Sequence, residues 1–284
     1  MLAVPAVALP PDAETSTTTT TGLSGTPAGN ATESRADVPP PADTHDRSLL
    51  IADLGRRLLT AYPSHLSRVE AATLVWRDGT RMPLDDGAPL KPGADWLATP
   101  DLKDMFRYRY PAGDAPTAPP LHVDPGRARN AAFFKKMYGD CRRGEVASRL
   151  VDVAWMPKRS SLKLKATAVN GVAERLERIS TELEVLPGSY ARYLLPPAGT
   201  YNCRVVAGTY QPSAHGYGIA IDIAVARSHY WRWSKPDAAG HPVWNNSIPL
   251  EIVRIFERHG FIWGGRWSHY DTMHFEYRPE LLVP

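Results

Sequence analysis

The sequence predicts an α+β fold in which helices pack on a small antiparallel sheet. Residues 219–225 and 274–277 alternate between large apolar side chains and small or polar ones, which is the two-residue period of half-buried strands. Residues 171–185 and 248–259 repeat their apolar side chains at the 3.6-residue period of amphipathic helices. All four elements fall within residues 166–284, which we expect to form one domain.

Composition limits the classes of protein to consider. The chain has 284 residues, of which 43% are hydrophobic, enough for one large domain or two small ones. The formal net charge is +3 without any long run of Lys or Arg, so nucleic-acid binding is not indicated, while a weak attraction to anionic polymers fits. No apolar run reaches the length of a membrane-spanning helix, so we expect no transmembrane segment.

The N-terminal segment has low complexity, with a threonine run at Thr17–Thr21 and a proline run at Pro39–Pro41. Such a segment cannot bury enough apolar surface to offset the entropy lost on ordering, so we expect residues 1–46 to be a disordered tail or linker. Its first residues, Met1–Leu9, are apolar but short and lack a basic leader. They are either the remnant of a signal peptide or unrelated to export.

Residues 47–165 are expected to form a helical and irregular region packed on the C-terminal domain. Leucines at helical spacing predict a helix over residues 47–75, and turn residues follow at 76–79. The leucines of its apolar face are Leu49, Leu50, Leu54, Leu58 and Leu59. Residues 100–150 are rich in aromatic and basic side chains, with a helix near 128–138. This stretch is either aromatic core or the wall of a substrate cleft with cations for carboxylates.

Capping residues mark the ends of the two C-terminal helices. Asn170 is expected to cap the first helix, which Pro187 and Gly188 end. Ser247 is expected to cap the second helix, and Gly260 to end it. The side chains expected to be buried on these helices are Val172, Leu176, Ile179, Leu183, Ile252, Ile255 and Phe256.

Two segments, Ser213–Asp222 and Asp271–Tyr277, contain the side chains with the clearest chemistry. They offer two imidazoles and two carboxylates, on His215, Asp222, Asp271 and His274. A catalytic zinc hydrolase needs this set: three nitrogen or oxygen ligands, an open position for water, and one carboxylate to handle the proton. Asp222 stands between two alanines, where little bulk blocks a metal, and glycines flank the loop that holds His215.

The spacing His-x6-Asp followed by Asp-x-x-His resembles that of zinc peptidases that act on bacterial cell-wall peptides. These are the VanY/VanX-type D-alanyl-D-alanine carboxypeptidases and the L-alanyl-D-glutamate endopeptidases, which share the hedgehog/DD-peptidase fold. The signature Ser-x-His-x-x-Gly-x-Ala-x-Asp is complete from Ser213 to Asp222. The pattern Gly-Gly-x-Trp-x-x-x-Asp-x-x-His-Phe-Glu is complete from Gly264 to Glu276. The resemblance covers roughly residues 196–282.

The resemblance implies that the sheet carries a zinc site and that the C-terminal domain is a zinc peptidase acting on peptidoglycan stem peptides, in the periplasm or secreted. The implied zinc ligands are His215, Asp222 and His274. Asp271 is the implied general base, and an aspartate at this position is more typical of the endopeptidases. Arg204 is implied to reach the active site, where it holds a carboxylate or the developing oxyanion. The alternative for Arg204 is a structural salt bridge.

Four further side chains are candidates for contact with substrate: Ser213, Tyr217, His269 and Glu276. Ser213 alternatively shapes the loop before His215. Glu276 is alternatively the base in place of Asp271, or it orients a metal ligand or braces an arginine.

The two cysteines, Cys141 and Cys203, lack the spacing of a structural metal site. They either form a disulfide in an oxidising compartment or stay unpaired. A thiol nucleophile at Cys203 is discounted, because the set of histidines and aspartates is complete without it.

Three functions are compatible with these residues. The favoured one is a zinc peptidase of the wall, as an L-Ala-D-Glu endopeptidase or, alternatively, a D-Ala-D-Ala carboxypeptidase. The second is a non-catalytic module that binds wall peptides, against which the complete set of ligands and base argues. The third is another zinc hydrolase on the same scaffold, because fold and metal do not fix the substrate.

Overall fold

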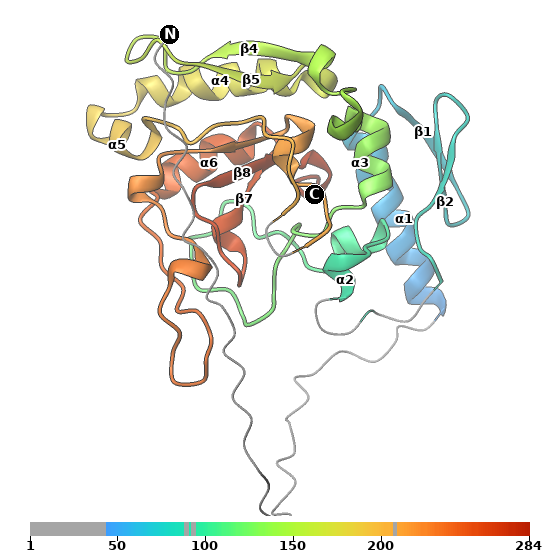
Figure 1. The fold of residues 1–284 in the computed structure, drawn as a ribbon. Helices are drawn as coiled ribbons and strands as arrows, with labels where there is room; N and C mark the ends of the chain where they lie inside the picture. Colours follow the sequence, from blue (N-terminus) through green and yellow to red (C-terminus); the bar gives the residue numbers. More distant parts are fainter. Residues whose placement is uncertain (1–43, 88–90, 92–94, 207–208) are drawn as a thin grey trace, which may run out of the picture. The chain divides into compact units, whose positions relative to one another are not determined.

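The computed structural model describes residues 44–87, 91, 95–206 and 209–284, which combine helices with small antiparallel sheets, as the α+β prediction requires (Figure 1). The helices are α1 (Thr44–Ala61), α2 (Asp95–Ala98), α3 (Ala131–Tyr138), α4 (Val172–Val185), α5 (Ala191–Leu194) and α6 (Leu250–Arg258). The strands are β1 (Leu66–Glu70), β2 (Thr73–Trp76), β3 (Arg81–Pro83), β4 (Leu150–Ala154), β5 (Lys163–Thr167), β6 (Ala220–Asp222), β7 (Phe261–Trp263) and β8 (His274–Tyr277). None of the described helices combines the length and the apolarity needed to cross a bilayer.

The first described element, α1, is shorter than the sequence predicts. The predicted tail lies outside the described residues except for residues 44–46, which begin this helix. The helix ends at Ala61 because Pro63 follows closely and disfavours helical backbone in the residue before it. Residues predicted to continue the helix instead form the antiparallel pair of β1 and β2, and β3 joins β2 on its other side.

The apolar face predicted for α1 is only partly buried. Leu54 and Leu58 lie in the core, whereas Leu49 and Leu50 are 58% and 45% exposed. Next along the chain, α3 begins at the cap Asn130, whose side chain accepts a hydrogen bond from the Phe133 backbone N–H at 2.9 Å. The aromatic side chains of this helix belong to the main hydrophobic core, as the core interpretation of residues 100–150 expects.

The expected caps of α4 and α6 are wrong, although the buried stripes of both helices are confirmed. Asn170 has a positive φ of 58° and its side chain donates to the hydroxyl of Tyr138, so Gly171 takes the cap position. Pro249 takes the cap position of α6, because the hydroxyl of Ser247 pairs with His229 Nε2 at 2.8 Å. Gly260, with a φ of 88°, follows the last turn of α6 as predicted.

The sheet that positions the site has the strand order β6–β8–β7, and both pairs are antiparallel. Its register sets Asp222 directly opposite His274 and Ala220 opposite Glu276, so these four side chains share one face. The predicted strand over 219–225 is cut short after Asp222, because Val225 turns outward, 44% exposed, into a single 3-10 turn.

The opposite face of this sheet is apolar. Phe275 of β8 stacks on Phe256 of α6 with 3.9 Å between ring centroids, and Ile221 and Trp263 are fully buried beside it. Helix α4 packs against α6 and also covers the hairpin of β4 and β5 (Figure 1). The core therefore fills one side of the sheet and leaves the polar side chains on the other.

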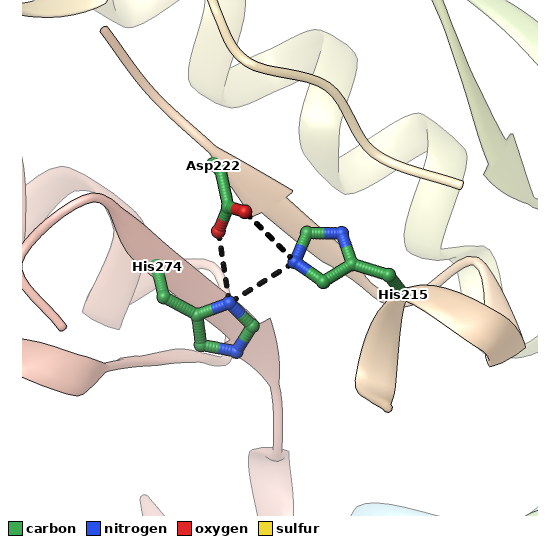
Figure 2. A group of neighbouring side chains, drawn as sticks. All are labelled: His215, Asp222 and His274. Atoms are coloured by element: carbon green, nitrogen blue, oxygen red, sulfur yellow. Dashed lines mark hydrogen bonds and ion pairs between the residues drawn. The ribbon is translucent and has the colours of Figure 1, made fainter. Parts of the chain in front are cut away.

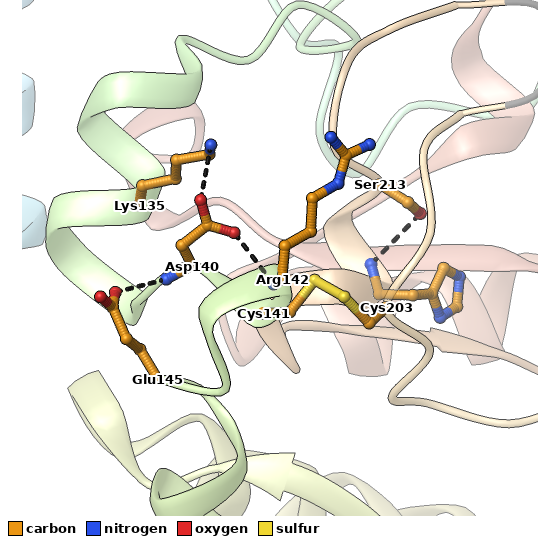
Figure 3. The surroundings of a disulfide bond; sticks show 8 residues. Lys135, Asp140, Cys141, Arg142, Glu145, Cys203 and Ser213 are labelled. Carbon is orange, nitrogen blue, oxygen red and sulfur yellow. Dashed lines mark hydrogen bonds and ion pairs between the residues drawn. A yellow bond between two sulfur atoms is a disulfide. The ribbon is translucent and has the colours of Figure 1, made fainter.

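A disulfide joins Cys141, just after α3, to Cys203, in the segment that precedes Arg204 (Figure 3). A Cβ built on Gly216 would lie 3.3 Å from the sulfur of Cys141, so the bridge packs directly on the loop that carries His215. The bridge thus fastens a segment of the first half of the chain to the segment that holds the site.

Replacing both cysteines, Cys141→Ser with Cys203→Ser, should lower the free energy of unfolding by about 2–4 kcal/mol, because the unfolded chain regains the entropy of a long open loop. Urea titration followed by circular dichroism measures this change. Wild-type protein treated with a reducing agent is the matched control and should unfold like the variant. Equal stability of the variant and the oxidised wild type would contradict a structural role for the bridge.

Candidate metal centre

His215 lies in a single 3-10 turn, Ala214–Tyr217, which has defined residues at both ends. The hydroxyl of Ser213 accepts a hydrogen bond from the His215 backbone N–H at 3.4 Å and caps the turn. Gly218 ends the turn with a φ of 70°, and a Cβ at this position would lie 2.7 Å from Leu150 Cδ2. The serine and the glycine of the motif therefore shape the loop that aims the imidazole.

Three donor groups converge on one point (Figure 2). His215 Nε2 lies 3.2 Å from His274 Nδ1 and 3.2 Å from Asp222 Oδ2, and His274 Nδ1 lies 2.9 Å from Asp222 Oδ1. One ligand atom from each residue can be chosen so that all lie within 4.8 Å of one another. The structure thus brings together the three side chains that the sequence predicts as metal ligands, and this group could hold a metal ion.

Each imidazole has a protein partner on its other nitrogen. His215 Nδ1 lies 2.5 Å from the backbone carbonyl of Thr200, and His274 Nε2 lies 3.1 Å from the carboxylate of Glu276. When these nitrogens donate to the oxygens, the lone pairs of His215 Nε2 and His274 Nδ1 face each other and Asp222. Partners of this kind fix the tautomer and orientation of metal-binding histidines, so the donor set fits a divalent metal.

Glu276 is 0% exposed, and arginines surround its carboxylate. Both of its oxygens accept hydrogen bonds from Arg129, and Oε1 accepts another from Arg278 at 3.0 Å. Burial alone raises the pKa of Glu276, but the two guanidinium groups and His274 hold it well below its usual range. The small side chain of Ala220 opposite Glu276 leaves room for this network.

Asp271 lies at the edge of the same centre, where its backbone carbonyl accepts from the His274 N–H at 3.2 Å. Its Oδ1 is buried and has no hydrogen-bond partner among the described residues. Burial, and next the negative charge of Asp222, raise the pKa of Asp271 to about 6, while the charges of the histidines and Arg204 oppose this rise. An unpaired carboxyl group with this pKa can accept and release a proton near neutral pH.

The paired glycines before Asp271 have a steric cause. A Cβ on Gly264 would lie 2.6 Å from the Asp271 carbonyl oxygen, and a Cβ on Gly265 would lie 2.1 Å from the ring of Trp263. Trp263 in turn donates its indole N–H to the carbonyl of Thr272 at 2.9 Å. Only glycine therefore allows this tight packing of the turn that presents Asp271.

Arg204 is exposed, and its guanidinium donates a hydrogen bond to the carbonyl of Val205 at 3.4 Å. The Arg204 backbone carbonyl accepts from the Ser213 N–H at 3.0 Å, which places this arginine beside the loop of His215. Its charge acts on Asp271, because it opposes the rise in the pKa of that carboxyl group. Arg204 forms no salt bridge within the described part of the chain, and its guanidinium is open to solvent.

The remaining predicted side chains are placed as follows. Tyr217 is buried against Phe134, with ring centroids 5.6 Å apart, and its hydroxyl has no partner among the described residues. His269 is not among the converging donors, and its Nδ1 pairs with the buried Asp124 at 2.7 Å. The burial of Glu276 favours its role in orienting His274 and bracing arginines over contact with substrate.

Three residues that bond to side chains of the site were not predicted from the sequence: Arg129, Thr200 and Arg278. Arg129 belongs to the stretch whose cationic groups are considered for a substrate cleft, yet it serves the buried carboxylate. Thr200 acts through its backbone carbonyl, which no residue type could reveal. Arg278 follows Glu276 by two residues, which is the spacing at which strand side chains share a face. This spacing is the only local signal of their ion pair.

Comparison with known proteins supports a peptidase. Residues 207–277 match a family model described as D-alanyl-D-alanine carboxypeptidase. No curated protein sequence matches the chain. The matched segment contains His215, Asp222, Asp271 and His274, and it leaves out Arg204. This match supports the broad family of the resemblance and a role in peptide hydrolysis in the bacterial cell wall.

The substitution Glu276→Gln should weaken binding of a divalent metal about 10- to 100-fold, because His274 loses the charged acceptor that orients it. Titration of metal-free protein with Zn²⁺ against a competing chelator measures the affinity. Glu280→Gln is the matched control, since Glu280 is also buried and pairs with Arg278 but does not contact His274. Equal weakening in both variants would show that general loss of stability, and not the orientation of His274, is responsible.

Metal binding should depend on pH through His274. Burial alone lowers the pKa of His274, but its hydrogen bonds and charge interactions with Asp222 and Glu276 raise it to about 9 in the metal-free protein. Below this pH the imidazole holds a proton that the metal must displace, so affinity should rise about tenfold per pH unit between about pH 7 and 8.5. Calorimetry in buffers of different ionisation enthalpy should detect about one released proton. An affinity that does not change over this range would contradict the assignment.

Proposed function

We propose that this chain is a zinc metallopeptidase that hydrolyses stem peptides of bacterial peptidoglycan. One observation carries the proposal: the buried Oδ1 of Asp271, which has no hydrogen-bond partner among the described residues, lies near three side chains whose donor atoms converge. A purely structural carboxylate at such a depth would be expected to have hydrogen-bond partners. The family match over residues 207–277 supports the same class of reaction.

The ligands we assign to zinc are His215, Asp222 and His274. Two imidazoles and one carboxylate are a set that catalytic zinc accepts in peptidases, with the fourth position left for water. The partners on Thr200 and Glu276 present one nitrogen of each imidazole to the ion. A bound zinc ion lowers the pKa of a water molecule and polarises a peptide carbonyl.

Around this centre the residues of the chain have distinct tasks. Asp271 accepts the proton of the attacking water and later delivers it to the leaving amine. Its pKa of about 6 suits both transfers near neutral pH. The exposed guanidinium of Arg204 binds a substrate carboxylate or the developing oxyanion.

Two bonds in the stem peptide are candidates for cleavage. The description of the matching family favours the D-Ala-D-Ala bond. The aspartate at position 271, in place of a glutamate, favours the L-Ala-D-Glu bond by the resemblance described above. Cleavage of either bond hydrolyses a wall peptide, and the two possibilities differ in the new termini of the products.

The alternative of a non-catalytic binding module is disfavoured by Asp271. A module that only binds peptide has no use for a buried carboxyl oxygen that lacks a partner in the described part of the chain and lies at a candidate metal centre. The disulfide between Cys141 and Cys203 supports an extracellular or periplasmic location, because such bridges persist in oxidising compartments.

Mass spectrometry of purified peptidoglycan digested by the zinc-loaded protein tests the proposal. Hydrolysis should produce new termini, and their identity, at L-Ala or at D-Ala, names the bond. Intact peptides after prolonged incubation with fully loaded protein would refute the proposed activity.

The substitution Asp271→Asn should leave zinc bound and lower kcat by about 10²- to 10⁴-fold, because the amide cannot accept the proton of the water. Metal content and turnover are measured on the same sample. Asp152→Asn is a suitable control, since Asp152 is an exposed residue of β4 that pairs only with Lys165. Full activity of the Asp271 variant would remove this residue from the mechanism.

A further inference from the structure

A pocket lies in the loop that follows β6, and one of its lining residues, Tyr230, pairs with Asp271 in an antiparallel bridge. Its volume is about 460 Å³, within the range of roughly 300–1,000 Å³ that small-molecule sites occupy. The aromatic side chains of its wall are Tyr230, Trp233, Trp244 and Tyr270, and the other lining residues used below are Lys235 and Asn245. Neither the proposed zinc ligands nor Asp271 belongs to this wall.

Hydrogen bonds hold the polar ends of two of these aromatic side chains. The indole N–H of Trp244 donates to the carbonyl of Gly265 at 3.0 Å, and the hydroxyl of Tyr270 donates to the carbonyl of Val243 at 2.8 Å. Trp233 packs edge-on against Tyr230, with centroids 5.4 Å apart, yet remains 57% exposed. Trp244 and Tyr270 are therefore held in fixed orientations, and the ring of Trp233 is open to solvent.

Polar groups without protein partners accompany this aromatic surface. The side chains of Lys235 and Asn245 are exposed, and neither makes a hydrogen bond or an ion pair within the described part of the chain. An amide and an ammonium group can bind hydroxyl, carbonyl or carboxylate oxygens. Such a mixed wall differs from an apolar groove for a protein partner, which would offer a continuous hydrophobic patch.

The chemistry of this wall matches a sugar ring. The C–H groups of a pyranose form an apolar face with slight positive charge, which packs on the negative face of an aromatic ring. Hydroxyl and acetamido groups at the rim of the sugar need hydrogen-bonding partners of the kind that Asn245 and Lys235 supply. A peptide of alternating D- and L-residues offers no comparable flat face.

The pocket is joined to the general base by the backbone. Tyr230 pairs with Asp271 across an antiparallel bridge, and the Trp231 N–H donates to the carbonyl of Tyr270 at 2.9 Å. The neighbours of Asp271 in space and in sequence, Tyr230 and Tyr270, thus line the pocket. The pocket wall and Asp271 are therefore linked through two adjacent backbone segments.

We propose that this pocket binds an amino-sugar ring of the peptidoglycan glycan strand while the attached stem peptide enters the metal centre. The inference rests on the proposed function and extends it to the substrate class, a glycan-linked peptide. It also selects the bond. The L-Ala-D-Glu bond lies one residue from the sugar, whereas the terminal D-Ala-D-Ala bond lies about 10 Å further along an extended chain. A sugar site adjoining Asp271 favours cleavage of the nearer bond.

Binding of the disaccharide N-acetylglucosaminyl-N-acetylmuramic acid to metal-stripped protein tests the pocket without any need for peptidase activity. Nuclear magnetic resonance of the indole N–H groups gives the affinity and identifies the tryptophans affected. Trp233→Ala should weaken binding at least about tenfold, whereas Trp233→Phe, which keeps an aromatic face, should retain most of it. Val185→Ala removes an exposed apolar side chain of α4 outside the pocket and should change nothing.

The zinc-loaded enzyme provides a second readout. It should cleave the disaccharide-linked pentapeptide with a higher kcat/KM than the free pentapeptide, and Trp233→Ala should abolish this difference. No binding of the disaccharide, or unchanged binding by Trp233→Ala at wild-type thermal stability, would overturn the inference. An equal loss of kcat/KM for the free peptide would identify a peptide subsite and overturn it as well. Disaccharide binding without any peptide cleavage would refute the proposed function and leave the sugar site standing.

Discussion

The buried carboxylate of Glu276 is the contact on which the geometry of the metal centre depends. It accepts a hydrogen bond from His274 and is neutralised by Arg129 and Arg278, all with little or no exposure to solvent. A carboxylate buried in this way is stable only while its cationic partners stay in place. His274, whose imidazole faces Asp222, is therefore held in place by charged side chains. One of them, Arg129, lies outside the sheet. The orientation of His274 therefore depends on packing between distant parts of the chain.

Local patterns, together with the family resemblance, predicted that His215, Asp222 and His274 lie together, and the structure brings their donor atoms within 4.8 Å of one another. Strand alternation placed Asp222 and His274 on polar faces, and the observed register pairs them directly. Glycine and serine at fixed spacing predicted a tight loop at His215, because their roles as turn and cap are local. The same reasoning holds for Asp271, whose turn is fixed by the glycines that precede it. Signals within each segment predicted its local shape, and the resemblance joined the two segments.

The interactions that escaped prediction join residues far apart in the chain. Arg129 meets Glu276 across 147 residues, and the disulfide spans 62. Nothing near Arg129 or either cysteine in the sequence indicates its partner. The helix caps failed for a related reason: Ser247 has the right residue type, but a tertiary contact with His229 takes its hydroxyl. The intrinsic preference of a residue for a helix cap is overridden when its side chain forms a tertiary hydrogen bond in the folded protein.

Arg129 lies far outside the segment that matches the family model, and this separation affects how the segment can be exchanged between proteins. The segment that the family model matches ends at Tyr277, one residue before Arg278, and it excludes Arg129. Transplanted alone, it would carry Glu276 into its new host without either guanidinium, and the buried carboxylate would have to find new cations or take up a proton. Recombination at these borders would therefore keep His215, Asp222 and His274 together and still disturb the orientation of His274. Inheritance of the segment together with Arg129 and Arg278 would keep the buried carboxylate of Glu276 paired.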